Sequence, residues 1–361
     1  MSTTLSSPAR PVGAGYSRAP FWMLLATLAG LLLATVVLAV AIGPVSIPPG
    51  LVWQMVADRL LGDGLGPWDA AQLNIVWLIR LPRVLLAVCV GAGLATVGVV
   101  MQAVVRNALA DPYILGVSAG ASVGAVSVLE LGWFAFAGLY AISLGAFAGA
   151  LLTFGVVFLL AQSGGRLSPI RLVLAGVACA YIFSGLTSFL ILTSDNRELA
   201  RSVLAWLLGS LAGADWPDLT LPVAVLLAGC GYLQLRARSL NALVMGDETA
   251  ATLGVDVHPF RRQLFLVLSV VTGVMVAVSG AIGFVGLMVP HMVRMVVGSD
   301  HRRVLPVAAL AGSLFLTWVD VVARTAFAPV ELPVGVITAL LGGPFFIWLM
   351  RTRRDALRDG L

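Results

Sequence analysis

Two charged residues stand four positions apart in an apolar segment near the end of the chain. Asp320 lies within the hydrophobic run 304–322, and Arg324 follows just beyond it. A carboxylate inside a membrane segment could carry a proton, which would suit transport driven by an ion gradient. The spacing instead favours an ion pair, because residues four apart share one face of a helix. We expect the structural pair and keep the proton-coupling role of Asp320 as the alternative.

Arg80 and Arg83 form a second group of charges, in the motif RLPR at the start of another apolar run. Arginines near helix ends often extend toward lipid headgroups. A guanidinium group can also donate two parallel hydrogen bonds to a carboxylate, so both residues could bind acidic groups on a partner protein. The residue types alone leave both interpretations open.

The composition is that of a membrane protein. Hydrophobic residues make up 60% of the 361 positions, charged residues make up 11%, and the mean hydropathy is +1.01. A membrane-spanning helix needs about 20 predominantly apolar residues. We therefore predict an all-α, polytopic protein with ten transmembrane helices. The predicted spans are about 21–43, 83–105, 112–130, 137–161, 170–192, 217–235, 263–281, 284–298, 304–322 and 333–350.

Ten spans divide the chain into a tail over 1–20, a transmembrane domain over 21–350 and a tail over 351–361. Both tails then lie on one side of the membrane, and the excess of arginine in the loops on that side predicts that it is the cytoplasm. The second and seventh spans share a pattern of small residues and enter from opposite sides, which predicts two inverted five-helix halves. Among the 22 basic residues, those outside the cytoplasmic segments are Arg59, Arg80, Arg83, Arg197, Arg201 and Arg324.

Several kinds of chemistry are excluded by what the sequence lacks. Every basic residue is arginine, and a P-loop requires a lysine against the nucleotide phosphates, so the chain is not itself a P-loop ATPase. Cys89, Cys179 and Cys230 all lie in apolar segments and are interpreted as buried hydrophobic residues. We predict no catalytic residue, no metal site, no cofactor bound by this chain and no nucleic-acid partner.

The stretch NALVMGDETAATLGV, residues 241–255, lies in the segment from Arg236 to Arg262, the longest predicted cytoplasmic segment between two spans. Ser239 and Asp247 are suitable caps for two short helices, and Gly246 and Gly254 are suitable ends. An amphipathic hairpin lying on the bilayer is disfavoured, because the acidic residues of this stretch would be repelled by an anionic membrane surface. We predict a rigid polar projection that contacts a cytoplasmic protein.

Three shorter segments complete the pattern. In LGVSAGASVGA, Gly116, Gly120 and Gly124 recur every four residues beside Ser118, a spacing that is typical of close helix packing. In RNALADP, Asp111 is placed to cap the helix that follows. The segment 201–210 is too short to span and is predicted to form a helix at or near the outer surface.

Four blocks, in order and at consistent spacing, resemble the FecCD family, whose members are ten-span permeases of type II ABC importers for iron-siderophore complexes, haem and cobalamin. The blocks are RLPRVLLAVCVGAGLATVGVVMQAVVRNALADPYILGVSAGASVGAV (80–126), the segment 241–255, SGAIGFVGLMVPHMVR (279–294) and ELPVGVITALLGGPFFIWLM (331–350).

The resemblance implies a function without covalent chemistry in this chain. It implies the permease subunit of an ATP-driven importer that moves a bulky metal chelate, iron-siderophore or haem first and cobalamin next, from a periplasmic binding protein into the cytoplasm. It also implies a homodimer in the bacterial inner membrane, surrounded by lipid, with both termini cytoplasmic. The partners would be two ABC ATPase subunits, which hold ATP and magnesium, and one binding protein.

The resemblance also assigns roles to particular residues. Arg80, Arg83 and Arg324 would dock carboxylates of the binding protein, and the segment of about 239–255 would supply the coupling helices for the ATPase. The coupling residues are Leu243, Met245, Gly246, Asp247, Glu248, Thr249, Ala250, Leu253 and Gly254. The residues expected along the translocation path are Gly116, Ser118, Gly120 and Gly124.

Overall fold

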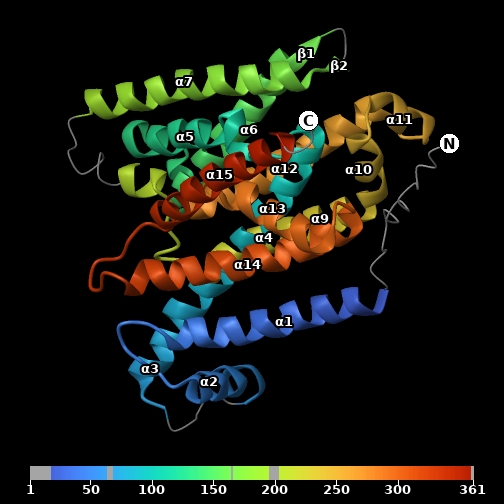
Figure 1. Cartoon of the computed structure of the whole chain (residues 1–361). Coiled ribbons are helices and arrows are strands. Elements are labelled where there is room, and N and C mark those ends of the chain that lie inside the picture. The colour runs from blue at the N-terminus through green and yellow to red at the C-terminus, as the bar shows by residue number, and fades with distance from the viewer. Residues whose placement is uncertain (1–17, 63–67, 164–165, 195–202, 359–361) are drawn as a thin grey trace, which may run out of the picture.

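A computed structural model describes residues 18–62, 68–163, 166–194 and 203–358 as a bundle of long helices (Figure 1). In this part of the chain the extended structure is one antiparallel pair of two-residue strands, β1 (Gln162–Ser163) and β2 (Arg166–Leu167). The predicted all-α class is therefore confirmed. Most of the predicted N-terminal tail and the last three residues lie outside the described residues.

Each of the ten predicted spans contains a helix, and eight of these helices are long and apolar enough to cross a membrane. The other two, α5 and α13, have 15 and 13 residues and would cover only about 20 Å. They are shorter than the predicted spans. The ten helices are α1 (Arg18–Ala41), α4 (Leu81–Val105), α5 (Val117–Leu131), α6 (Ala141–Ala161), α7 (Pro169–Thr193), α9 (Trp216–Leu235), α12 (Val257–Ser279), α13 (Val285–Val297), α14 (His301–Thr325) and α15 (Val334–Arg358).

Short helices connect these elements. The last long helix, α15, continues to Arg358, so the predicted boundary at 351 is not a break in the helix. Residues 203–207 are helical within the predicted short segment 201–210. The remaining connecting helices are α2 (Pro49–Leu61), α3 (Ala70–Asn74), the π-helix η1 (Ile75–Arg80), the 3-10 helices η2 (Pro112–Leu115) and η3 (Ala135–Tyr140), α10 (Ala237–Val244) and α11 (Asp247–Thr252).

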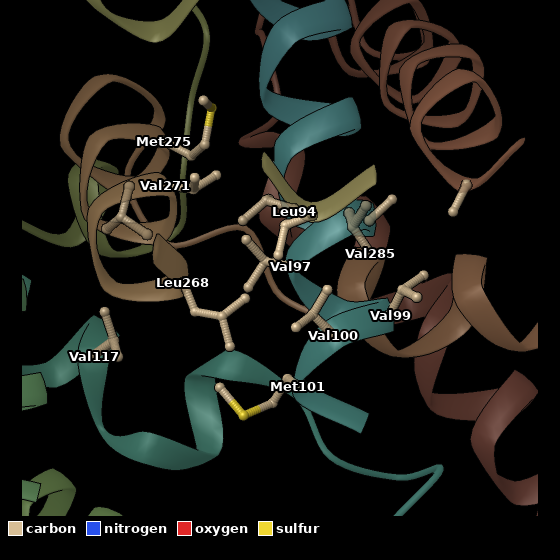
Figure 2. Packing of buried hydrophobic residues seen from close by; sticks show 14 of the residues in the cluster. Leu94, Val97, Val99, Val100, Met101, Val117, Leu268, Val271, Met275 and Val285 are labelled. Atoms are coloured by element: carbon tan, nitrogen blue, oxygen red, sulfur yellow. The ribbon is translucent and has the colours of Figure 1, made fainter. Parts of the chain in front are cut away.

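Helix α4 is the centre of the core. Figure 2 shows apolar side chains of α4, among them Leu94 and Val97, meeting side chains of α5, α12 and α13. Two glycines of α4 bring backbones together, because a Cβ at Gly91 would overlap a carbonyl of α14 and one at Gly98 would overlap Gly286 of α13. Close backbone approach of this kind is a main source of helix association in membranes.

The two short helices start at the same place inside the bundle. Each follows a residue with positive φ, Gly116 at 71° before α5 and Phe284 at 69° before α13. The backbone N–H of Ile282 donates a hydrogen bond to the hydroxyl of Tyr113 over 3.1 Å, which joins the two starts. Helices α5 and α13 are the third long elements of the two predicted halves.

The bundle has two distinct ends. In Figure 1 the start of α1, the end of α15 and helices α10 and α11 lie at one end, called here the α10–α11 end. Arg303, at the start of α14, stacks on Phe21 of α1 with 5.7 Å from the guanidinium carbon to the ring centre, which joins these starts. Helices α2 and α3 lie at the opposite end, called the α2–α3 end.

Candidate functional sites at the two ends of the bundle

A buried ionic cluster lies at the α2–α3 end. One carboxylate oxygen of Asp320 accepts a hydrogen bond from the Nε of Arg83 over 3.0 Å. The other oxygen lies 3.5 Å from the Nε of Arg324. Arg83 also contacts Glu331 at 2.8 Å. The predicted pair of Asp320 and Arg324 is confirmed, whereas the contact with Arg83, 237 residues away, had no local signal in the sequence.

Two of the arginines also bind the end of α1. Arg80 donates hydrogen bonds to the carbonyls of Val40, Ala41 and Val45, and Arg324 donates one to the carbonyl of Ala39. The last carbonyls of a helix have no partner within the helix, and cations near that end interact favourably with the helix dipole. Arg80 therefore fastens the end of α1 to the end of η1, directly before α4, and Arg324 fastens it to α14.

The predicted docking arginines lie together, but they do not face outward. Arg80, Arg83 and Arg324 are 5%, 7% and 4% exposed, and their guanidinium groups are directed at groups of the same chain. In this structure the three arginines therefore offer no free donors at the surface, and their role in docking stays a prediction. The physical reason is that charges removed from water need partners, and these three find carboxylates and carbonyls within the chain.

The same contacts leave little support for a proton-carrying role of Asp320. This residue is fully buried, and each of its two carboxylate oxygens lies next to an arginine. A carboxylate that exchanges protons with a path would need an accessible oxygen. The geometry favours the structural interpretation of Asp320.

At the other end, α10 and α11 form the predicted pair of short helices with an elbow between them. Helix α10 begins at Ala237, directly after α9, so Ser239 is not its cap. Gly246, with φ 116°, separates the two helices, and Asp247 is the first residue of α11 rather than its cap. Gly254, with φ 82°, follows α11, as predicted.

The predicted coupling residues divide into an anchor and an exposed tip. Leu243 and Ala250 are fully buried, so in this structure their side chains anchor the pair within the chain and do not lie at its surface. Met245 and Leu253 are 67% and 63% exposed, and the adjacent Val244 is exposed as well. The other predicted coupling residues are half-buried or exposed, namely Gly246, Asp247, Glu248, Thr249 and Gly254.

Asp247 fastens α11 to two long helices. Both of its carboxylate oxygens accept hydrogen bonds from the buried Arg261 of α12, each over 2.8 Å. Arg106, which follows α4 with φ 53°, lies 3.3 Å from the same carboxylate. Sequence reasoning assigned Asp247 to a helix cap and a partner contact, and it missed this role because Arg106 is far away in the chain.

A second link joins α10 to the start of α14. The amide of Asn241 donates a hydrogen bond to Asp300 over 2.7 Å, and its carbonyl oxygen accepts one from the backbone of His301 over 2.9 Å. Burial would raise the pKa of Asp300, but hydrogen bonds from Arg302 and Asn241 outweigh it and lower the pKa to about 2. The α10–α11 pair is thus held by α4, α12 and α14.

The glycines predicted along the path are used for packing. Gly116 packs against α7, and Gly120 and Gly124 pack against facing glycines of α6, where added Cβ atoms would overlap the backbone. The structure shows close helix packing at these glycines, and their place along a translocation path stays a prediction. Ser118 is half-buried, and its carbonyl accepts the hydroxyl of Ser122 over 2.6 Å.

Two features of the described residues bear on metals and redox chemistry. Cys89 and Cys179 are buried free thiols and Cys230 is a partly buried one, as predicted from their apolar segments. In the part of the chain that the structure describes, no three His, Cys, Asp or Glu side chains gather in a way that could hold a metal ion.

These features together describe a multi-pass helical membrane protein, and comparisons with known proteins define its class. The model of the FecCD transport family matches residues 31–352. The chain is 48% identical over 286 residues to the cobalamin import system permease protein BtuC of Halobacterium salinarum, covering 79% of this chain and 75% of that protein. It is 43% identical over 295 residues to the hemin transport system permease protein HmuU of Yersinia pestis, covering 80% and 85%.

A solved structure gives the same result. It is described as an inward-facing conformation of a metal-chelate type ABC transporter, and it matches with a TM-score of 0.79 and 33% identity over 91% of this chain and 99% of that one. The chain therefore belongs to the FecCD transport family of ABC importer permeases, and the resemblance found in the sequence is confirmed.

Proposed function

We propose that this chain is the membrane-spanning subunit of an ATP-driven importer that carries a bulky metal chelate into the cytoplasm. Cobalamin and hemin are the substrates in the names of two relatives, and iron-siderophore complexes belong to the same chemical class. The observation that carries the proposal is the α10–α11 pair, which exposes an apolar tip while its base is held by ion pairs and hydrogen bonds. ATP and magnesium belong to the partner ATPase.

The proposed orientation places the α10–α11 end in the cytoplasm. The excess of arginine in the segments at that end supports it, because positively charged loops stay on the cytoplasmic side. Both ends of the described chain lie there as well (Figure 1). Two chains would form a homodimer with the path between them, and inverted halves are supported by the corresponding short helices α5 and α13.

We propose that force from the ATPase enters at the exposed tip. Helix-in-groove contact with Met245 and Leu253 would move α11, and Asp247 would pass the motion to α4 and α12 because it bonds to both. Helix α4 in turn contacts α13 through Gly98 and α14 through Gly91, and at both glycines the two backbones are in close contact. Rigid-body motion of packed helices is a common form of switching.

The binding protein would dock at the α2–α3 end, but by exchange of partners rather than onto free arginines. Glu331 holds Arg83 at 2.8 Å and is 43% exposed through its side chain, so it is the member of the cluster that reaches the surface. A carboxylate of the binding protein could displace Glu331 and take its place on Arg83. Glu331→Gln should then strengthen association with the binding protein, and an unchanged or weaker association would contradict the exchange.

The test of the main proposal is co-purification of the subunits from native membranes in mild detergent. We expect two copies of this chain with two ATPase subunits, and loss of the ATPase from Met245→Asp and Leu253→Asp. These variants alter exposed side chains, whereas reversal of Asp247 would also break internal contacts. A chain that purifies alone while transport continues would contradict the proposal. If the subunits do co-purify, the substrate can be identified by comparing how strongly the binding protein stimulates the ATPase when it is loaded with haem, a ferric siderophore or cobalamin.

A further inference from the structure

A groove of about 590 Å³ lies between α6 and α12, toward the α10–α11 end. Its volume falls within the range of roughly 300–1,000 Å³ that is usual for sites of small ligands. Its walls are apolar over most of their length, and two polar residues of α12 mark one end. The lining residues are Leu151, Phe154, Gly155 and Phe158 of α6 and Arg262, Gln263, Phe265, Leu266 and Ser269 of α12.

The groove has an aromatic floor and an open side. Phe265 of α12 lies 5.2 Å from Phe154 and 5.5 Å from Phe158, measured between ring centres. Leu266 is exposed, and a Cβ added at Gly155 would meet no atom within 4 Å. From Arg262 to Ser269 the groove follows α12 for seven residues, or about 10 Å along the membrane normal for an upright helix. An elongated apolar group fits this shape.

The polar end of the groove carries positive charge. Arg262 is exposed and has no ion pair or hydrogen bond within the described residues. Beside it, Gln263 accepts hydrogen bonds from the hydroxyl of Tyr232 over 2.9 Å and from Arg236 over 3.4 Å. Arg236 is held in place over the ring of Phe260, 5.4 Å from its centre. Two guanidinium groups thus stand where an apolar slot meets the membrane boundary.

We propose that this groove binds an anionic glycerophospholipid from the leaflet at the α10–α11 end. One acyl chain would lie along Phe154, Phe158 and Phe265, and the phosphate would contact Arg262 and Arg236. Basic pockets between membrane helices favour anionic headgroups, and a guanidinium group is suited to paired hydrogen bonds with phosphate. If Arg262 only extended its charge toward the lipid headgroups, no apolar groove beside it would be needed.

The position of this lipid has a consequence for the coupling helices. Arg262 directly follows Arg261 in α12, and Arg261 is 2% exposed and binds Asp247 of α11. A lipid held by Arg262 would therefore restrain the same turn of α12 that holds the coupling pair. The inference goes beyond the proposed transport function, because it depends only on the groove and its charges.

Native mass spectrometry of the full chain in mild detergent tests the inference. The probes are palmitoyl-oleoyl phosphatidylglycerol and phosphatidylcholine with the same acyl chains. We expect phosphatidylglycerol to be retained more strongly, and Arg262→Gln to reduce its retention about fivefold, equivalent to about 1 kcal/mol for one arginine near a charged surface. Arg262→Lys should restore most of the retention, and Arg238→Gln, which removes an exposed charge outside the groove, should not change it.

A second pair of variants tests the apolar slot. Gly155→Leu should fill the groove and release the lipid, whereas Gly30→Leu, at an equally open position on α1, should have no effect. Three results would overturn the inference: equal retention of both lipids that is insensitive to Arg262→Gln, retention unchanged by Gly155→Leu, or a change from two copies to one in Gly155→Leu. The last result would mean that a second copy of the chain covers the groove.

Discussion

The two ends of the bundle use arginine and carboxylate groups in opposite ways. At the α2–α3 end, Arg83, Arg324 and Asp320 are buried, and their polar groups contact one another or the end of α1. At the α10–α11 end, Asp247 lies partly exposed at the base of a projection whose apolar tip reaches the surface. The first arrangement holds helices together, whereas the second holds a contact surface in position. Charge near a helix end is therefore no guide to function until its burial is known.

The comparison predicts a large loss of stability when the buried ionic cluster is broken. Asp320→Ala would leave Arg83 and Arg324 buried with one fewer carboxylate, and the loss of one member of a buried ion pair is worth about 3–5 kcal/mol. We expect a marked fall in thermal stability in detergent, together with loss of assembled protein. Glu331→Gln, at the exposed edge of the cluster, is the control and should have a smaller effect. Normal stability of Asp320→Ala with transport that no longer responds to a proton gradient would instead support ion coupling.

Helix α4 connects the two ends, and its glycine contacts should be the next most sensitive feature. Gly98→Ala would place a Cβ against Gly286, so α4 and α13 would have to separate. Overpacking of this kind typically lowers the free energy of unfolding by about 1–3 kcal/mol. Gly30→Ala, on α1, has no atom within 4 Å of the new Cβ and is the matched control. Equal melting temperatures for both variants would show that the close contact is unimportant.

The sequence predicted the elements of this comparison better than their contacts. The long spans followed from uninterrupted apolar runs, and the pair of Asp320 and Arg324 followed from a spacing of four residues. The starts of α5 and α13 could not be predicted in this way. Both helices begin inside the bundle, directly after a residue with positive φ, and no polar capping residue at a surface marks them. The contact of Arg83 with Asp320 depends on how α4 packs against α14, which no local pattern encodes.

Burial also separated correct from incorrect roles within each predicted site. Leu243 lies in the last turn of α10 and Met245 directly follows the helix, and the resemblance assigned both to the partner contact. Leu243 is completely buried and most of Met245 is exposed, because Met245 keeps a helical backbone and positions two apart on a helical turn lie on different faces. The amphipathic pattern of α10 alone predicts which of these residues are buried and which are exposed.

A smaller effect is expected at the α10–α11 end, where the ion pairs are partly solvated. Asp247→Asn would weaken the contacts with Arg261 and Arg106, and the expected loss of stability is about 1–2 kcal/mol, because Arg261 is buried but Asp247 is partly exposed and asparagine keeps one side-chain oxygen that can accept a hydrogen bond. The functional effect should exceed the structural one, with ATPase stimulation by the loaded binding protein falling while the subunits stay associated. Glu248→Gln, which removes an exposed charge from the same turn, should leave stability unchanged. Loss of association in Asp247→Asn would place this residue in the interface itself.

The smallest effect concerns Asp300, which links α10 to α14 at the surface. Its pKa is lowered to about 2 in the folded chain, below the value of about 3.9 for an unperturbed aspartate, so its contribution to stability is complete above about pH 4 and is lost as the pH falls toward 2. Asp300→Asn should therefore lower stability by less than about 1 kcal/mol at pH 7, because Asp300 is half-buried but its main charged partner, Arg302, is exposed and screened by water. The difference between the two proteins should stay constant from pH 8 to pH 5 and shrink below pH 4. Melting curves across this range would measure it, and a difference that grew on acidification would contradict the assigned hydrogen bonds, because protonation removes the charge that Arg302 binds.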